Sequence, residues 1–269
     1  MRSMNVMSAI PLSCAFVLSA ALGAWAQAPT LPYDHIHLNV PDQAKAVEWY
    51  QKNFGGKPTT EAPDRLMFGT TRLNFLKNAD GKPSAGSSID HIGFSFADLD
   101  AKMKELEAAG VKIVTPVRDV PNLFKLGFVE DPWGTKIEVV QDTGLLGLHH
   151  IHLRAPDPAE MFTWLLAKFG GERTKLKGQI DALKYSAAGF SDMWVLVQRG
   201  ESTPSEGRAI DHIGWRATNL ADKIAELKTA GVKVTTEPRP LTLPDKTTIQ
   251  YAYVEGPAGA KIELVQRPR

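Results

Sequence analysis

All seven histidines of this 269-residue chain lie in four short, similar phrases. The first and third phrases read DHIHLNVPD at 34–42 and HHIHLRAPD at 149–157, and the second and fourth share IDHIG at 89–93 and 210–214. A single histidine on a strand is usually a structural residue, but imidazole is also a common transition-metal ligand. Because the histidines recur together at corresponding places, the phrases predict repeated metal sites.

A glutamate accompanies each pair of histidine phrases. Glu138 lies in TKIEVVQ at 135–141, and Glu263 lies in AKIELVQ at 260–266. Two imidazoles and one carboxylate that leave other positions open form the facial triad of non-haem Fe(II) sites, a donor set that Mn²⁺ and Zn²⁺ also accept. Grouped by sequence halves, the predicted metal ligands are His35, His91 and Glu138 in the first half and His150, His212 and Glu263 in the second.

The other three histidines receive different predictions. His37 and His152 lie two residues beyond the first histidine of their phrases, so they share its strand face. They are candidates for contact with substrate or with the ligands, or for the polar lining of a cavity. His149 points to the opposite face of its strand, and we expect it to be structural.

The phrases mark the start of four similar units. Each unit reads as an alternating strand, an Asp or Asn at a helix N-cap, an amphipathic helix that stops at a glycine, and three short strands. The predicted N-caps are Asp42, Asp98, Asp157 and Asn219, and the predicted helix ends are Gly55, Gly110, Gly170 and Gly231. This repetition predicts an α+β fold of four βαβββ modules in two domains, residues 31–143 and 147–267.

Residues 1–26 read as a secretory signal peptide, because Arg2 precedes an apolar run over 6–25 that ends in a small-residue cleavage site near Ala26. We therefore expect a periplasmic or secreted protein with no membrane attachment after cleavage. The only cysteine, Cys14, would leave with the signal, so the mature chain would have no disulfide and no thiolate ligand.

Charge and motif content argue against several classes of protein. The chain has 31 Lys and Arg against 30 Asp and Glu, and removal of Arg2 leaves 31 − 1 = 30 basic residues, so the mature chain is formally neutral. Nucleic-acid binders usually carry a basic excess, and no nucleic-acid partner is expected. Motifs of serine hydrolases, nucleotide-binding loops and HExxH metalloproteases are absent from the sequence. We expect a small-molecule substrate and a monomer or homodimer.

These features resemble the vicinal oxygen chelate superfamily, which includes glyoxalase I, extradiol dioxygenases and bleomycin-resistance proteins. The resemblance covers 33–267 and is carried by the family phrase H-I-x-L-x-V-x-D at 35–42 and 150–157 and by D-P-x-G-x-x-I-E at 131–138. It implies paired βαβββ modules whose sheets curl around a metal. Each module would supply a ligand from its first strand, and a last strand would supply the glutamate.

Departures from the family pattern reduce the number of reactions that the resemblance supports. Proteins that resemble glyoxalase I usually have a fourth metal ligand, a glutamate. At the corresponding place this chain has Asn74 in the first half and Trp194 or Val195 in the second. Extradiol dioxygenases carry a catalytic histidine ahead of a conserved tyrosine segment, and neither half has that histidine. The tyrosine itself is present as Tyr253, a candidate substrate contact, and is replaced by Phe128 in the first half.

The sequence thus predicts an exported, metal-dependent enzyme that acts on a small oxygen-chelating substrate and is dioxygenase-like in preference to lactoylglutathione lyase-like. Three protein ligands favour Fe²⁺ or Mn²⁺, and Zn²⁺ or Ni²⁺ is compatible. No catalytic acid or base is assigned. One alternative is a non-catalytic periplasmic protein that binds a drug or aromatic compound, as bleomycin-resistance proteins do. Another is a division of labour in which the C-terminal half is degenerate.

Overall fold

The computed structural model describes residues 28–268, so the predicted signal peptide lies outside the described residues. Modules 1 and 2 contain β1 (Tyr33–Val40), α1 (Gln43–Phe54), β2 (Lys57–Pro58), β3 (Arg65–Phe68), β4 (Thr71–Lys77), β5 (Ile89–Ser95), α2 (Leu99–Ala108), β6 (Lys112–Asp119), β7 (Lys125–Glu130) and β8 (Lys136–Val140). Modules 3 and 4 contain β9 (Gly147–Ala155), α3 (Pro158–Phe169), β10 (Glu172–Leu176), β11 (Ile180–Tyr185), β12 (Met193–Arg199), β13 (Ile210–Arg216), α4 (Leu220–Thr229), β14 (Val234–Thr242), β15 (Thr248–Glu255), the short 3₁₀ helix η1 (Pro257–Gly259) and β16 (Lys261–Gln266). The predicted α+β fold of four βαβββ modules is confirmed. Within residues 28–268, no helix is both long and apolar enough to cross a bilayer.

The helices begin where their capping residues predict. The side chains of Asp42, Asp98, Asp157 and Asn219 each accept a hydrogen bond from a backbone N–H in the first turn of α1, α2, α3 and α4. Gly55 and Gly170 cap α1 and α3 at positive φ, whereas an alanine caps α2 and α4 and the predicted glycine follows it, also at positive φ. Local sequence signals therefore determine the helix boundaries.

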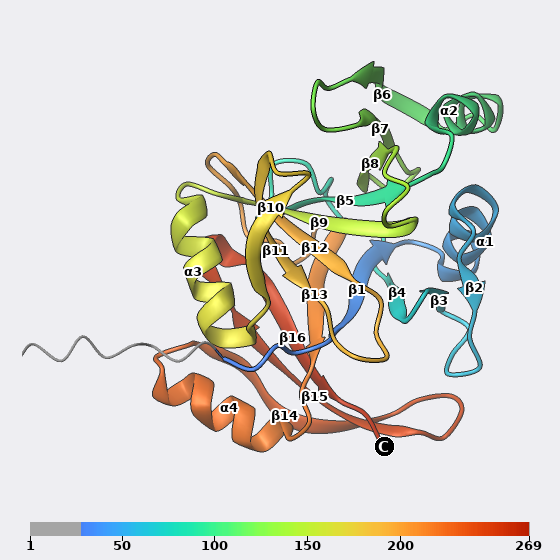
Figure 1. Cartoon of the computed structure of the whole chain (residues 1–269). Helices are drawn as coiled ribbons and strands as arrows, with labels where there is room; N and C mark the ends of the chain where they lie inside the picture. The colour runs from blue at the N-terminus through green and yellow to red at the C-terminus, as the bar shows by residue number, and fades with distance from the viewer. Residues whose placement is uncertain (1–27, 269) are drawn as a thin grey trace, which may run out of the picture.

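The four modules form two eight-stranded sheets, and each sheet takes one module from each half of the chain (Figure 1). Sheet A has the order β14-β15-β16-β13-β1-β4-β3-β2 and combines modules 1 and 4. Sheet B has the order β10-β11-β12-β9-β5-β8-β7-β6 and combines modules 2 and 3. In each sheet the first strands of the two modules pair antiparallel at the centre, β1 with β13 and β5 with β9. Neither sheet is built from one half of the sequence alone.

The connecting segments account for this pairing. The short segment 141–146 joins β8 to β9, which run antiparallel on either side of β5, so modules 2 and 3 remain in one sheet. Two longer segments, 78–88 and 200–209, lead from one sheet to the other. The two segments lie side by side and form two isolated bridges, between Lys82 and Arg208 and between Ser87 and Thr203.

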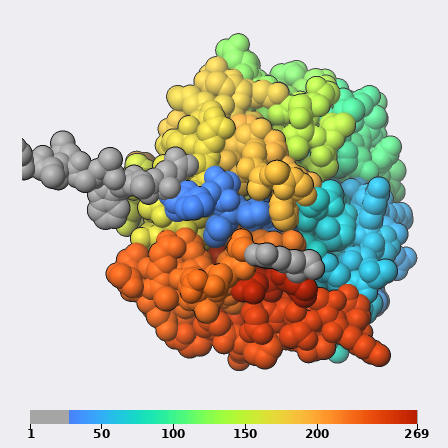
Figure 2. Space-filling view, turned by 60° about the horizontal axis from the view of Figure 1, so that its bottom comes forward, coloured from blue at the N-terminus to red at the C-terminus, as the bar shows by residue number. Residues whose placement is uncertain are grey.

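One apolar core joins the two sheets. Trp215 of β13 is fully buried, stacks on Phe169 of α3 at 4.8 Å between ring centroids and meets Tyr33 of β1 edge-on at 5.2 Å. Phe54 of α1 contacts Phe94 of β5 in the other sheet at 4.6 Å. In Figure 2, the blue start of the described chain lies between the yellow third module and the orange–red fourth module. Core residues alternate with His35 and His37 along β1 and with His150 and His152 along β9, so these four histidines face away from the core.

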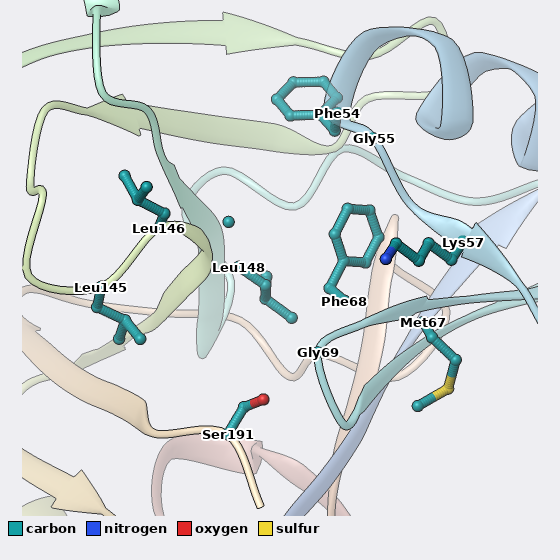
Figure 3. Close-up of a pocket in the computed structure, with 11 residues that line it drawn as sticks. Phe54, Gly55, Lys57, Met67, Phe68, Gly69, Leu145, Leu146, Leu148 and Ser191 are labelled. Carbon is teal, nitrogen blue, oxygen red and sulfur yellow. The ribbon is translucent and has the colours of Figure 1, made fainter.

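A surface pocket of about 260 Å³ lies where module 1 meets the segment that joins the two halves (Figure 3). Phe54, Phe68 and Leu148 line it, together with Lys57 and the hydroxyl-bearing Ser191. Ser191 Oγ accepts a hydrogen bond from the backbone N–H of Thr70, which links the two sheets beside the pocket. None of its lining residues is a histidine or a glutamate, so this pocket is separate from the predicted ligands.

Candidate metal centres

Among the described residues, two clusters could hold a metal ion, and both consist of residues that the sequence singled out. We call them centre A, with His35, His37, His212 and Glu263, and centre B, with His91, Glu138, His150 and His152. In each cluster one ligand atom from every residue lies within 4.8 Å of the others.

Centre A lies at the middle of sheet A. His35 comes from β1, His212 from β13 and Glu263 from β16, and all three are buried. Their donor atoms converge, because Glu263 Oε2 lies 2.9 Å from His212 Nε2 and 3.3 Å from His35 Nε2.

Centre B repeats this arrangement in sheet B. His91 comes from β5, Glu138 from β8 and His150 from β9, and all three are buried. Glu138 Oε2 lies 3.1 Å from His91 Nε2 and 3.1 Å from His150 Nε2. The two centres are therefore nearly the same in the placement of their two imidazoles and one carboxylate.

The predicted grouping of these ligands by sequence halves is wrong. His35 lies with His212 and Glu263 rather than with His91, and His150 lies with His91 and Glu138 rather than with His212. The reason is the strand pairing, since β1 lies beside β13 and β5 beside β9. Each centre takes residues from both halves, so neither half contains a complete centre.

Aspartates orient three of the four candidate ligand imidazoles, a role that was not predicted from the sequence. Asp34, Asp90 and Asp211 each place a carboxylate oxygen against Nδ1 of the following histidine, at 2.9, 2.7 and 2.6 Å. A carboxylate only accepts, so Nδ1 carries the proton and Nε2 is directed at the glutamate. The Asp-His dipeptide in three of the four phrases is the sequence signal for this role.

His149 occupies the fourth of these positions. It precedes His150 as Asp34 precedes His35, and its Nδ1 lies 2.9 Å from His150 Nδ1. Its Nε2 lies 3.4 Å from Asp142 Oδ2, and the Lys177 ammonium donates to the other oxygen of Asp142 at 2.6 Å. Burial and the neighbouring His150 lower the pKa of His149 to about 4. The prediction that His149 is merely structural thus overlooked a contact with a candidate ligand.

Two glycines make room for the imidazoles. Gly214 lies opposite His35 across the β1–β13 pair, and a Cβ on Gly214 would lie 2.1 Å from His35 Cε1. Gly93 lies opposite His150 across the β5–β9 pair, and a Cβ on Gly93 would lie 2.0 Å from His150 Cε1. No side chain fits at these positions while the rings stay in place. The glycine of the unchanged IDHIG repeat is the sequence signal for this role.

The electrostatics of each cluster keep its glutamate ionised. Burial alone would raise the pKa of Glu138, but hydrogen bonds with His150 and His91 outweigh burial and hold that pKa well below its usual value. Glu263 shows the same balance, with His35 and His212 lowering its pKa. Burial opposes protonation of His35, yet Glu263 and Asp34 together raise the pKa of its imidazole. The glutamate of each centre is thus ionised at neutral pH, and its carboxylate favours a positive charge between it and the neighbouring imidazoles.

The outer edge of each centre differs between the two sheets. His37 and His152 lie on the ligand face as predicted and are partly exposed, and burial together with the neighbouring imidazoles lowers the pKa of both rings well below the usual value. His37 Nε2 contacts the Asn74 amide on β4, whereas Leu196 on β12 lies opposite His152.

The aromatic residue beside each carboxylate also differs. Tyr253 of β15 lies opposite Glu263 and meets the His212 ring at 5.0 Å, whereas Phe128 of β7 holds the corresponding place beside Glu138. Burial and then Glu263 raise the pKa of Tyr253, so its hydroxyl retains its proton near neutral pH.

Three arginines surround the Asp34 carboxylate. The Arg216 and Arg267 guanidiniums both donate to the buried Asp34 carboxylate at 2.8–2.9 Å, and Arg72 lies 3.5 Å from it. Burial alone would raise the pKa of Asp34, but His35 and Arg267 hold it well below its usual value. Asp34 therefore stays a carboxylate and an acceptor for His35.

The family model of the Glyoxalase/Bleomycin resistance protein/Dioxygenase superfamily matches residues 33–139 and 147–264. The match covers most of the chain, and the fold and the paired clusters agree with it. The chain belongs to this superfamily.

The chain is similar to a solved structure and to a characterised enzyme. The structure of glyoxalase I from Zea mays aligns with a TM-score of 0.68 and 19% identity, and the alignment covers 88% of this chain and 92% of that chain. At this identity the likeness shows the fold alone. A trivalent organoarsenical cleaving enzyme from Bacillus sp. (strain MD1) is 32% identical over 65 residues. That alignment spans only 23% of this chain and 40% of the relative.

Proposed function

We propose that this chain is an exported, metal-dependent enzyme of the superfamily, with one divalent cation in centre A and one in centre B. In each centre two buried imidazoles and one glutamate would hold the cation: His35, His212 and Glu263 in centre A, and His91, His150 and Glu138 in centre B.

A single observation carries the proposal. Asp34, Asp90 and Asp211 each accept from Nδ1 of their histidine, so a neutral imidazole at these places presents the Nε2 lone pair to the glutamate oxygen. A lone pair directed at a carboxylate oxygen about 3 Å away is unfavourable, and it is relieved either by a proton on Nε2, which makes the contact a hydrogen bond, or by a metal cation between the two atoms. His35 Nε2 is indeed buried without a hydrogen-bond partner.

The spacing of the donor atoms fits this interpretation. Metal–ligand bonds to His and Glu are roughly 2.0–2.2 Å long, so two ligand atoms at a right angle lie about 3.0 Å apart. The nitrogen–oxygen distances of 2.9–3.3 Å in centre A and 3.1 Å in centre B agree with that figure. The donor set of two imidazoles and one carboxylate supports Fe²⁺ or Mn²⁺, and Zn²⁺ or Ni²⁺ is compatible.

The surrounding side chains would orient a substrate. A divalent cation in such a site supplies Lewis acidity for a substrate that chelates it through adjacent oxygens. In centre A, the protonated hydroxyl of Tyr253 is a hydrogen-bond donor beside Glu263, and His37 with Asn74 forms a polar edge. Buried ligands behind partly exposed His37 and His152 would limit access of water to the reacting atoms.

The reaction that we favour is dioxygenase-like, because three protein ligands leave several coordination positions open. Export rests on the predicted signal peptide, and a small-molecule substrate with a monomeric or homodimeric enzyme remains part of the proposal. The short similarity to the organoarsenical cleaving enzyme adds trivalent organoarsenicals to the compounds that merit testing, beside catechols and α-keto acids.

Elemental analysis of the anaerobically purified chain tests the proposal. We expect about two metal ions per chain, about one in His91→Ala or His212→Ala, and none in the double variant, since each change removes one ligand of a three-ligand site. Oxygen uptake with the three substrate classes then tests the reaction. Absence of transition metal from the wild-type chain, also after incubation with Fe²⁺ or Mn²⁺, would contradict the proposal and favour the non-catalytic binding protein.

A further inference from the structure

The two centres have the same types of ligand, but the groups that contact Nδ1 of their imidazoles differ. In centre A both ligand imidazoles contact carboxylates, since His35 Nδ1 lies 2.9 Å from Asp34 and His212 Nδ1 lies 2.6 Å from Asp211. In centre B only His91 has such a partner, Asp90, at 2.7 Å. The second imidazole, His150, instead contacts His149 at 2.9 Å.

The contacts of His149 determine how it is protonated when His150 binds a cation. A ligating His150 uses Nε2, which faces Glu138, so its Nδ1 carries a proton and donates to His149 Nδ1. His149 then carries its own proton on Nε2, directed at Asp142 at 3.4 Å. His149 is therefore a neutral ring that separates His150 from the carboxylate of Asp142.

This separation weakens the hydrogen bond that His150 donates from Nδ1, because its acceptor is a neutral ring and not a carboxylate. A hydrogen bond to an ionised acceptor is roughly twice as strong as one between neutral groups. A carboxylate behind a ligating imidazole also makes that imidazole more basic, and loss of such a partner typically costs about 10–100-fold in metal affinity. Cations offset part of the charge of all three aspartates, since Arg216 and Arg267 donate to Asp34, Lys261 lies 3.1 Å from Asp211 and Lys136 lies 2.8 Å from Asp90. Asp211 still makes the shortest of these contacts to a ligand imidazole, at 2.6 Å from His212.

We propose that the two centres bind their cation with unequal affinity, and that centre A binds it more tightly because His149 replaces a carboxylate partner in centre B. This inference rests on the proposed function, in which both clusters bind metal. Centre A would fill first as the metal concentration rises, and His149 would act as a positioning residue that sets the weaker affinity of centre B.

Single-centre variants make the comparison direct. His91→Ala leaves centre A intact, and His212→Ala leaves centre B intact. Mn²⁺ is titrated into each metal-free variant at one fixed pH, and the electron paramagnetic resonance signal of free Mn²⁺ reports binding without any enzymatic assay. We expect the affinity of centre A to exceed that of centre B by about tenfold, the lower end of the range for such partners.

Two further changes test the cause. Asp211→Asn in the His91→Ala background should weaken centre A by about tenfold, and His149→Asp in the His212→Ala background should strengthen centre B by a similar factor. Asp181→Asn is the matched control, because it removes one negative charge from an exposed position on β11 without touching either centre. This change should leave both affinities unaltered.

The outcomes separate the inference from the proposed function. Equal affinities, or tighter binding in centre B, would overturn the inference and leave the proposed function standing. Unequal affinities that neither Asp211→Asn nor His149→Asp alters would overturn the role assigned to His149. Failure of both single-centre variants and of the wild-type chain to bind Mn²⁺, Fe²⁺ or Zn²⁺ would contradict the proposed function itself.

Discussion

At the scale of single residues, the absence of a side chain is as important as the ligands. Gly93 and Gly214 lie opposite His150 and His35 and leave space that the imidazole rings occupy. Because each ring lies so close to the backbone of the paired strand, the position of the ring depends on the glycine opposite it. A methyl group at either glycine would push one imidazole away from its glutamate.

We therefore expect Gly214→Ala to abolish metal binding at centre A while centre B remains occupied, and Gly93→Ala to do the reverse. Each change should also destabilise the fold by about 1–3 kcal/mol, as overpacking of a buried site does. Metal content per chain and urea denaturation measure the two effects. The variants serve as controls for each other, and full metal content in both would contradict the steric role of the glycines.

At the scale of elements, the helices depend on local caps, whereas the metal centres depend on strands. Asp157 begins α3 by accepting a hydrogen bond from the backbone N–H of Ala159 at 2.9 Å. The helix then buries Met161, Leu165 and Phe169 in the shared core. None of the residues of α3 belongs to either centre.

Asp157→Ala should accordingly lower the free energy of unfolding by about 1 kcal/mol, the usual cost of losing an N-cap. Chemical denaturation followed by circular dichroism measures this change. Metal content should stay at the wild-type value, and Asp157→Asn, which can still accept the hydrogen bond, should restore most of the stability. Loss of metal in Asp157→Ala would show that the helix supports a centre more directly than its contacts indicate.

At the scale of the whole molecule, each centre joins the two halves of the chain. Centre A takes His35 from the first half and His212 with Glu263 from the second, and centre B takes His91 with Glu138 from the first half and His150 from the second. The sheets are likewise shared, and the segments 78–88 and 200–209 pair as they connect them. Neither half of the sequence therefore contains a complete candidate metal centre.

Pairs of ligand substitutions test this arrangement. His35→Ala with His212→Ala removes two ligands of the same centre, so about one metal ion per chain should remain, whereas His35→Ala with His91→Ala affects both centres and should leave none. Elemental analysis distinguishes these results. If the ligands were grouped by sequence halves instead, the outcomes of the two double variants would be exchanged.

The sequence by itself determined the modules and the helix starts, and it singled out every residue of the two candidate clusters. Strand alternation placed His35, His37 and Glu138 on the faces where they are found, and the N-cap residues began each helix as predicted. These features depend on local periodicity and on hydrogen bonds within a few residues, so they can be recognised from adjacent letters.

Only the tertiary structure decided which histidines lie in the same cluster. All four first strands have nearly the same sequence, so the repeats fit a pairing of modules 1 with 2 equally as well as the observed pairing of 1 with 4 and 2 with 3. The choice depends on chain connection and on core packing, such as the stacking of Trp215 on Phe169 across modules. Likewise, the close approach of His149 to His150 and of His35 to Gly214 depends on strand register and ring orientation, which no short motif specifies.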